Sequence, residues 1–303
     1  MEAAGEHAVI ASTPTDAAAV PFERHLVHSA QIGELRLPSW LKLAAGVPTN
    51  VGLERAGLAG RDSHGDWHPT AAGLLMASDQ PQEHRGAAFF QAVAYRVTRP
   101  VSPGGGIPLL ATEDITGPLD RQIDVACDFV RRHMRVSAHR DSDGRNLDLR
   151  HVPRGAGAAI TPAGSAAGLS AYCRYAMRAV FEAVTNAVAH RDYTMRGSRI
   201  RLRLFDDRLE LFVPGALVGT MTPDSLAFRQ SSRNSVLISA LARCPVIGDD
   251  AGPRQTIMDK RGEGVSIILD ESEALSGRRP EYRLLDQSEL LLTIYAARLE
   301  DPT

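Results

Sequence analysis

The segment from residue 171 to residue 213 constrains the fold of this chain more than any other part of it. Its first half, AYCRYAMRAVFEAVTNAVAH, repeats apolar residues every three or four positions, as one side of an α-helix does. Its second half contains IRLRLF, two turn residues at Asp206 and Asp207, and RLELFV, and both flanking runs alternate as strands do. The segment therefore predicts a helix followed by an antiparallel hairpin of the sheet on which it packs.

The first strand of that hairpin also predicts how the sheet divides its two faces. Three apolar residues alternate with three arginines, and neighbouring side chains of a strand point to opposite faces. One face is therefore predicted to be buried and the other to be basic. The apolar residues are Ile200, Leu202 and Leu204, and the arginines are Arg199, Arg201 and Arg203.

Weaker patterns organise the rest of the chain. Residues 37–78 favour a helix, a turn, a short hairpin and a second helix. Residues 117–136 repeat apolar side chains as an amphipathic helix does, whereas residues 137–170 are polar and Gly-rich, as in a flexible connection. Two further elements are expected, a strand over residues 86–100 and a short helix beginning near Asp16.

Composition places the chain among globular proteins of the cytosol. Its 303 residues include 44% apolar and 23% charged residues, and no run approaches the roughly 18 apolar residues that a membrane helix needs. The N-terminal residues lack the basic start and the apolar core of a secretory signal. A cytoplasmic location without membrane contact is therefore expected, and the length admits either two units or one elaborated unit.

Cysteine usage and net charge exclude several classes of site. Cys127, Cys173 and Cys244 lie far apart with no Cys-x-x-Cys or Cys/His pairing, which argues against a zinc site and against a disulfide framework. Buried free thiols are the simpler interpretation. The net charge of −2 gives no general attraction to nucleic acid, so DNA binding would need a local basic surface or a partner.

The predicted helix carries a polar stripe along an otherwise apolar pattern. Glu182, Asn186 and His190 are spaced by four residues, so their side chains project from one face of the helix. The apolar residues beside them can pack on a sheet while the stripe faces a cleft. Three polar residues alone are more often a solvent-exposed face, so the surrounding motifs decide between the two interpretations.

A resemblance to a known family is carried by two stretches, EAVTNAVAHRDYTMRGSRIRLRLFDDRLELFVPGALVG and the later DKRGEGVSII. They resemble the bacterial ATP-binding proteins of the gyrase, heat-shock chaperone, histidine kinase and mismatch-repair (GHKL, or Bergerat-fold) type. Those relatives are described as helicase-like C-terminal domains or as Schlafen AlbA-linked transcriptional regulators. The resemblance extends upstream through HPTAAGLLMAS and TGPLDRQIDVACDFVRRHM and downstream past SSRNSVLISAL, and it covers most of residues 35–295.

The resemblance implies an α+β fold, a two-layer α/β sandwich of the GHKL ATPase type with a mixed sheet and helices on one face. A small and mainly helical N-terminal region is expected beside it. Residues 1–66 are expected to hold short helices and a truncated remnant of an AlbA-type DNA-binding domain. Residues 67–160 are expected to form a strand and a helix that lead into the ATPase fold, and residues 161–303 the GHKL-like ATP-binding domain itself.

The helix motif of the superfamily supplies a glutamate that polarises the attacking water and an asparagine that holds magnesium against the phosphates. By position in the motif these roles fall on Glu182 as the catalytic residue and on Asn186 as the metal ligand. Magnesium needs few protein oxygens when a triphosphate supplies the others, and a carboxylate one turn away can orient a water. His190, Arg191 and Asp192 end the helix, where a cation can contact phosphate or simply cap the helix.

Two glycine boxes complete the expected site. The first lets the backbone pass close under the adenine, and the second offers bare amides to phosphate oxygens. Val213 stands where the superfamily usually has an aspartate for the adenine amino group, which leaves the base selectivity open. Arg233, in a segment that resembles the lid of the relatives, is expected either to meet phosphate or to form a surface salt bridge. The first box is matched by Pro214, Gly215 and Gly219, and the second by Gly262 and Gly264.

The resemblance implies a protein that binds ATP with Mg²⁺ and acts as a regulator, most naturally of transcription, with weak or no ATP hydrolysis. Glu182 and Asn186 argue against complete degeneration, whereas Val213 and the insertion CPVIGDDAGPRQTIMDK argue for an altered pocket. Two alternatives stay open: a slow stand-alone ATPase, and a degenerate domain that serves only for interaction or dimerisation. DNA, a regulatory protein or a second copy of the chain are the expected partners. No GxxxxGK[ST] sequence occurs, so a P-loop helicase motor is not supported.

Overall fold

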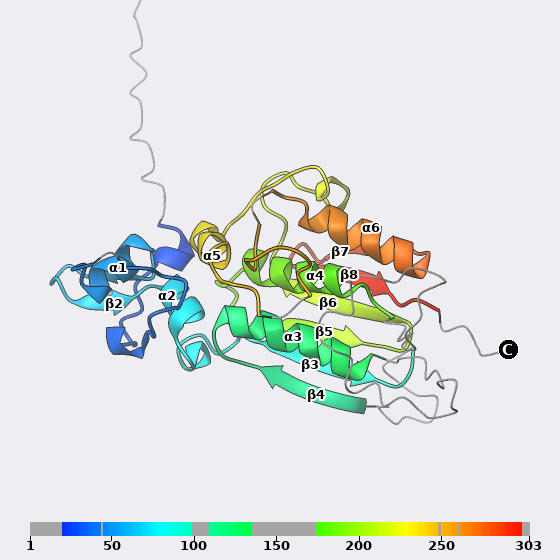
Figure 1. Cartoon of the computed structure of the whole chain (residues 1–303), viewed down its shortest axis with the longest axis horizontal. Coiled ribbons are helices and arrows are strands. Elements are labelled where there is room, and N and C mark those ends of the chain that lie inside the picture. Colours follow the sequence, from blue (N-terminus) through cyan, green and yellow to red (C-terminus); the bar gives the residue numbers. More distant parts are fainter. Residues whose placement is uncertain are drawn as a thin grey trace, which may run out of the picture.

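The computed structural model describes residues 20–43, 45–98, 109–134, 174–247, 250–259 and 261–298. A small N-terminal unit, residues 20–43 and 45–83, lies beside a larger body of sheet and helices (Figure 1). In chain order the N-terminal unit contains η1 (Phe22–Arg24), η2 (Ile32–Glu34), α1 (Thr49–Arg55), β1 (Ala59–Arg61), β2 (Trp67–Pro69), α2 (Ala71–Ala77) and η3 (Pro81–Glu83).

The larger body is built on a mixed sheet. In chain order its elements are β3 (Phe90–Tyr95), β4 (Leu109–Ile115), α3 (Leu119–His133), α4 (Met177–His190), β5 (Ile200–Leu204), β6 (Arg208–Pro214), η6 (Pro223–Ser225), α5 (Ser235–Leu241), α6 (Gly264–Ser276), β7 (Glu281–Leu285) and β8 (Glu289–Tyr295). The strand order is β4-β3-β5-β6-β8-β7, with β3 and β5 parallel and the other neighbouring pairs antiparallel. The helices α3, α4 and α6 cover one face (Figure 1). The predicted α+β fold, a two-layer sandwich with helices on one face, is confirmed.

The alternation predicted for β5 divides the sheet into its two faces. The three apolar side chains of β5 are each at most 2% exposed, as the prediction of a buried face requires. On the opposite face the Arg201 and Arg203 guanidinium groups lie 4.4 and 5.0 Å from the centre of the Phe212 ring. Arg201 also forms an ion pair with Glu289. The basic face is therefore packed on an aromatic ring and partly neutralised by an acidic neighbour.

The predicted helix over residues 171–190 is present, but α4 begins later, at Met177. Residues 171–173 lie outside the described residues. Arg174 is tied to the end of the chain instead of entering the helix. The Ala297 N–H donates to the Arg174 carbonyl at 2.8 Å, and the Arg174 guanidinium donates to the Ala297 carbonyl at 2.9 Å. A tertiary contact therefore sets the start of the helix.

The sequence patterns do not predict the strands β4, β7 and β8. β4 lies at an edge of the sheet and begins with two exposed leucines, Leu109 and Leu110, so it lacks the alternation of a half-buried strand. β8 contains four consecutive buried residues, 291–294, and periodicity cannot distinguish such a run from a helical segment. The short helix expected near Asp16 and the flexible connection expected over 137–170 lie outside the described residues.

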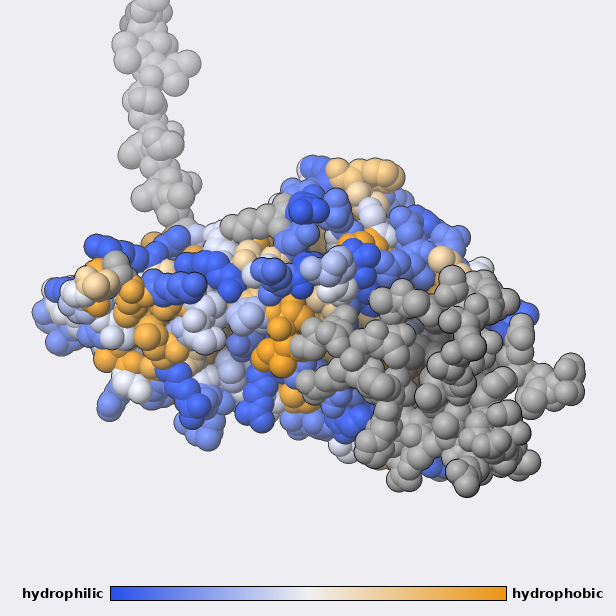
Figure 2. Space-filling model, in the orientation of Figure 1, coloured by the Kyte–Doolittle hydropathy of each residue, from blue (hydrophilic) through white to orange (hydrophobic). Residues whose placement is uncertain are grey.

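The N-terminal unit follows the predicted order of helix, turn, short hairpin and helix. α2 is buried along its whole length, and Thr70 caps its N-terminus. The Thr70 hydroxyl accepts the Gly73 N–H at 3.0 Å and donates to the Gly57 carbonyl at 2.7 Å, so it fixes α2 to the end of α1. Figure 2 shows apolar residues gathered over this unit, whereas most of the surface visible elsewhere is hydrophilic.

A buried carboxylate joins the N-terminal unit to the larger body. Glu23 is 1% exposed, and its oxygens accept the backbone N–H groups of Val236 and Leu237 at 2.9 and 3.1 Å. The Ser235 hydroxyl also donates to it, at 3.0 Å. These donors belong to the first turn of α5, whose orphan amides carry partial positive charge. Glu23 therefore caps α5 from a position 213 residues away from Val236 in the sequence.

The described cysteines match the expectation of buried free thiols. Cys127 and Cys244 are both buried and unpaired, and Cys173 lies outside the described residues. Burial raises the pKa of both thiols, so they are poor nucleophiles at neutral pH. Within the described residues no helix is both long and apolar enough to cross a membrane.

Candidate functional site

The polar stripe of α4 lies against the N-terminus of α6. Glu182 is 4% exposed, and Asn186, one helical turn later, is half-buried. Gly264 is the first residue of α6, and a Cβ atom there would lie 2.9 Å from Glu182 Oε2 and 3.1 Å from Asn186 Nδ2. The helix motif and the second glycine box, far apart in the sequence, therefore meet at a place where only glycine leaves both side chains undisturbed.

The N-terminus of α6 presents backbone donors to the stripe. No side chain caps α6, so its first N–H groups lack a partner of that kind and carry the positive end of the helix dipole. The Asn186 amide makes no hydrogen bond among the described residues. Such an arrangement can bind an anion at the helix end and a cation at the amide oxygen. These residues fit a metal-bound phosphate.

A loop between α5 and α6 folds back over α4. This segment, residues 244–247 and 250–257, is termed the Arg254 loop. Two backbone hydrogen bonds of 2.9 and 3.0 Å close its base, as in a short antiparallel ladder. Near its tip Gly252, with a φ of +69°, lies against the Arg178 side chain of α4. The loop is therefore packed on the helix that carries the polar stripe.

The tip of this loop places Arg254 against the buried carboxylate. Arg254 Nη2 lies 2.8 Å from Glu182 Oε1, and the guanidinium lies 5.0 Å from the centre of the Phe181 ring. The two side chains are only 16% and 5% exposed, so this pair is screened far less than a surface salt bridge. The contact is ionic and not a well-aligned hydrogen bond, because neither of the two atoms has a hydrogen-bond partner among the described residues.

Burial dominates the protonation of Glu182. Removal from water raises the pKa of its carboxyl, Arg254 and Arg178 oppose that shift, and Asp259 adds to it. Tyr282 of β7 lies close enough that burial and the Glu182 charge together raise the pKa of its phenol. Glu182 therefore keeps its proton to higher pH than an ordinary glutamate, as suits a group that takes up a proton during a reaction.

A second group of predicted residues meets at the C-terminal end of α4. The Asp192 N–H donates to the Pro214 carbonyl at 2.8 Å, and the Asp192 carboxylate accepts from Arg233 at 2.8 Å. Gly215 has a φ of +123°, and a Cβ there would lie 2.8 Å from Arg233 Nη1 and from Asp192 Cβ. Gly215 is therefore required for the close approach of the two segments, and Arg233 is engaged in an ion pair.

Hydrogen bonds to the main chain fasten this end of α4. Asn234 is 3% exposed, and its amide donates to the carbonyls of Ala189 at 3.0 Å and Arg191 at 2.8 Å. Helix ends leave such carbonyls without intrahelical partners. Arg191 is itself buried and donates to the Ser198 carbonyl at 2.6 Å. Asn234 thereby couples the start of α5 to the end of α4.

His190 is neutral in this environment. Burial lowers the pKa of its imidazole to about 4, and the charge of Arg233 adds to the shift. At neutral pH the ring therefore offers a hydrogen bond but no positive charge. The Arg191 guanidinium lies 4.7 Å from the centre of the Tyr193 ring. Neither His190 nor Arg191 presents a free positive charge to Glu182 or Asn186 in this structure.

The remaining residues of the glycine boxes lie outside these two groups. Gly219 is exposed with a φ of +62°, and no atom would lie within 4 Å of a Cβ there. Gly262 has a φ of +77° and packs on Gln230, whose amide donates to the Arg261 carbonyl at 3.2 Å. Val213 is 8% exposed and belongs to the apolar core, so the first box offers no carboxylate to a base.

Three residues that the sequence does not single out contribute to the site geometry. Arg254 contacts Glu182 and the charge of Asp259 raises its pKa; both belong to the insertion before the second glycine box, and no local pattern indicates which residue of an insertion will act on a distant carboxylate. Asn234 precedes an apolar helix, a position typical of an N-cap. That signal identifies Asn234 as structural. Its side chain, however, donates a hydrogen bond to a carbonyl of α4 and does not cap its own helix.

Comparison with known proteins bears on the C-terminal part of the chain. Residues 197–294 match the family described as "Putative ATP-dependent DNA helicase recG C-terminal", which covers less than half of the chain. The match includes both glycine boxes and the Arg254 loop but does not reach α4. It supports a GHKL-like ATPase domain, and with it nucleotide binding, in this region.

The fold is also similar to a crystal structure of the DIP2311 protein from Corynebacterium diphtheriae, with a TM-score of 0.56 and 18% sequence identity. The similarity covers 92% of this chain and 47% of that one, so this chain spans about half the length of DIP2311. At this identity the likeness shows the fold alone. No curated protein matches the sequence significantly.

Proposed function

We propose that this chain is a regulatory protein of the GHKL type that binds ATP with Mg²⁺ and hydrolyses it weakly or not at all. The observation that carries the proposal is the meeting of Glu182, Asn186 and Gly264 from two distant elements of the fold. An asparagine amide, a buried carboxylate and an uncapped helix N-terminus lie together there. The family match over residues 197–294 supports the same class of domain.

The triphosphate is proposed to bind at the N-terminus of α6. The uncapped N–H groups offer hydrogen bonds and the positive end of a dipole to phosphate oxygens. Asn186 is the proposed protein ligand of Mg²⁺, a cation that neutralises phosphate charge and keeps several of its own waters. A side chain at Gly264 would push against Glu182 Oε2 and Asn186 Nδ2, which lie 2.9 and 3.1 Å from the position of its Cβ atom.

The base is proposed to lie over the first glycine box. Gly215 lets the backbone approach closely, whereas Val213 supplies only an apolar surface. Recognition would then rest on shape and main-chain groups, not on a carboxylate facing the adenine amino group. We therefore expect weaker discrimination between ATP and GTP than in a protein that has an aspartate at this position.

The pairing of Glu182 with Arg254 supports binding over turnover. A carboxylate acts on water only when it is free to accept a proton from it. Arg254 holds this carboxylate in an ion pair at 2.8 Å, so the carboxylate is not free to accept a proton from water. Hydrolysis would require the Arg254 loop to move first, so turnover is expected to be slow.

A path of contacts leads from the proposed site to the N-terminal unit. Asn234 holds the end of α4 and immediately precedes α5, and Glu23 caps the first turn of α5. A nucleotide that moves α5 would therefore shift the N-terminal unit as well. We propose that this coupling controls binding of DNA or of a regulatory protein, as in a transcriptional regulator, and that two copies of the chain pair when it operates.

Isothermal titration calorimetry with ATP and MgCl₂ tests the nucleotide site most directly. Wild type is compared with Asn186→Ala and with Asn50→Ala, because both variants replace an asparagine of a helix by alanine. We expect Mg²⁺-dependent binding in wild type and in Asn50→Ala. Binding should be at least about tenfold weaker in Asn186→Ala, since the metal ligand is lost while the helix propensity rises.

Phosphate release by the same proteins separates the remaining functions. Binding without turnover above background supports a regulator, and steady turnover by wild type supports the slow stand-alone ATPase. Absence of Mg²⁺-dependent ATP binding in wild type refutes the nucleotide site and leaves a domain for interaction or dimerisation. Equal binding by wild type and Asn186→Ala places the nucleotide elsewhere.

A further inference from the structure

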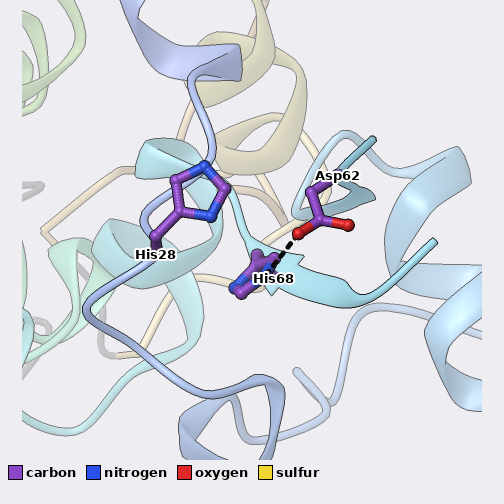
Figure 3. Close-up of side chains that lie close together, drawn as sticks. All are labelled: His28, Asp62 and His68. Atoms are coloured by element: carbon purple, nitrogen blue, oxygen red, sulfur yellow. Dashed lines mark ion pairs between the residues drawn. The ribbon is translucent and has the colours of Figure 1, made fainter. Parts of the chain in front are cut away.

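Three metal-ligating side chains gather in the N-terminal unit, outside the proposed nucleotide site. His28, Asp62 and His68 lie together there, with Asp62 and His68 joined by the dashed line (Figure 3). One possible ligand atom of each lies within 4.8 Å of the other two. The two imidazole rings meet edge to face with their centres 4.6 Å apart, and Asp62 Oδ2 lies 3.4 Å from His68 Nε2.

Backbone pairing brings these three residues to one place. Leu26 forms an antiparallel bridge with Thr70, and continuing that register puts His28 opposite His68. On the other side of β2, Gly60 of β1 pairs with His68. Asp62 follows Gly60 by two residues, so it lies on the same face of the extended backbone. Three neighbouring segments therefore each supply one ligand.

The carboxylate is held in place by its own turn. Asp62 Oδ1 accepts the backbone N–H groups of His64 and Asp66, both at 2.9 Å, which leaves Oδ2 toward His68. The 3.4 Å separation from His68 Nε2 is longer than an ordinary hydrogen bond. Among the described residues neither His28 nor His68 has a hydrogen-bond partner for its ring nitrogens, and His68 Nδ1 is buried without one.

The three side chains of the cluster differ in their exposure to solvent, and the exposed one leaves a route for an ion. The side chains of Asp62 and His68 are only 14% and 20% exposed, whereas His28 lies at the surface. The inner two ligands are therefore positioned by the fold, and the exposed His28 packs on them through its ring contact with His68. Ligand atoms around a tetrahedral Zn²⁺ lie about 3.3 Å apart, so His28 has to close in by a side-chain movement.

We propose that His28, Asp62 and His68 form a site for a divalent transition-metal ion of the Zn²⁺ class. Two imidazole nitrogens and one carboxylate oxygen suit such an ion, whereas Mg²⁺ and Ca²⁺ prefer oxygen ligands throughout. Three protein ligands leave the fourth position open. The bound ion would clip the segment before α1 to the β1–β2 hairpin. No cysteine takes part, so cysteine spacing in the sequence gives no sign of the site.

Zinc titration of the chelator-treated full chain by calorimetry tests this proposal. The proteins compared are wild type, His28→Ala, His68→Ala, Asp62→Asn and His84→Ala. His84 is a matched control in the same unit, because both of its ring nitrogens already have partners, Glu34 Oε2 at 2.8 Å and the Ser29 hydroxyl at 3.1 Å. We expect one Zn²⁺ per chain, bound at least about tenfold more weakly in the three ligand variants and unchanged in His84→Ala.

If His68→Ala fails to fold, the variant His28→Ala still tests the proposal. His28 makes no hydrogen bond among the described residues, so its replacement should leave the melting temperature of the metal-free chain unchanged. A Co²⁺-loaded wild type should show the visible absorption of four-coordinate cobalt, and His28→Ala should lose it. Equal Zn²⁺ affinity in wild type and His28→Ala, or an equal loss in His84→Ala, would mean an adventitious surface ion only and would overturn the proposal.

Discussion

The two ends of the polar stripe on α4 are held in different ways. At the C-terminal end, Asn234 and Asp192 make hydrogen bonds to main-chain carbonyls. Around Glu182 and Asn186 the contacts are an ion pair from Arg254 and the bare backbone of Gly264. Main-chain hydrogen bonds fix a helix in place, whereas an ion pair can be exchanged for another charge without unfolding. α4 is therefore anchored at its C-terminal end, and the site opens toward α6.

The largest expected effect tests the anchored end. Asn234→Ala leaves the carbonyls of Ala189 and Arg191 without their buried donor, and it should lower the free energy of unfolding by about 2 to 4 kcal/mol. Asn186→Ala is the matched control, because it removes no hydrogen bond within the described residues and should cost less than about 1 kcal/mol. Chemical denaturation measures both. Equal losses would contradict the difference between the two ends.

The pH dependence of stability sharpens the same comparison. His190 has a folded pKa of about 4, below its usual value of 6.5, so the unfolded chain binds the proton first as the pH falls. The native state should therefore lose about 2 kcal/mol between pH 7 and pH 5 through this group. His190→Gln should lose correspondingly less when unfolding is followed by denaturation at the two pH values. An identical pH dependence would show that His190 is not desolvated.

Glu182 should respond to pH in the opposite direction. Its folded pKa is raised, so its contribution to stability is present below the unfolded pKa of the carboxyl and is lost as the pH rises through the folded pKa. Glu182→Gln in the background of His190→Gln isolates this trend in the same denaturation series. The two groups together make the ends of the stripe distinguishable by their pH profiles alone.

Nucleotide affinity tests the open end of the stripe, around Glu182 and Asn186. Gly264→Ala places a methyl group 2.9 Å from Glu182 Oε2 and should weaken binding of ATP with Mg²⁺ by about tenfold or more in calorimetry. The cost in stability should stay below about 1 kcal/mol, because alanine favours the helix. Gly219→Ala is the control: its φ of +62° makes alanine cost about 1 kcal/mol of stability, with ATP affinity unchanged. Reversed outcomes would refute the assignment of the glycines.

The smallest expected effect concerns the ion pair at the open end. Arg254→Met keeps the bulk of the side chain but removes the charge, so ATP no longer has to separate Arg254 from Glu182. Affinity for ATP with Mg²⁺ should rise by about threefold. A decrease in affinity would mean that Arg254 itself contacts the nucleotide.

Local periodicity was enough to predict the central part of this fold. α4, β5 and β6 follow from residues that are neighbours in the sequence, and the buried face of β5 follows from simple alternation. Local patterns do not predict β4 and β8. β4 is an exposed edge strand, and β8 is buried without an alternation of apolar and polar residues. The start of α4 depends on a contact of Arg174 with Ala297 that no local pattern contains.

Sequence spacing predicts which residues of α4 share one face, but it does not predict what covers that face. The spacing of Glu182 and Asn186 placed them on one face of α4, and the second glycine box was expected nearby, where Gly264 lies. The sequence predicted a stripe that faces a cleft. Glu182 is instead buried under Arg254, because the insertion folds back onto α4. The cluster of His28 with Asp62 and His68 depends on strand register, which composition and spacing do not reveal.

The carboxylate of Glu23 sets a limit on how this chain can be synthesised and folded. It emerges from the ribosome 213 residues before Val236, one of the donors that it binds. Until α5 is present, Glu23 would either be buried without a partner or hold its segment open to water. The N-terminal unit therefore cannot complete its packing until α5 has been synthesised. It has to wait for the C-terminal half, so the two parts finish folding together although they are made at different times.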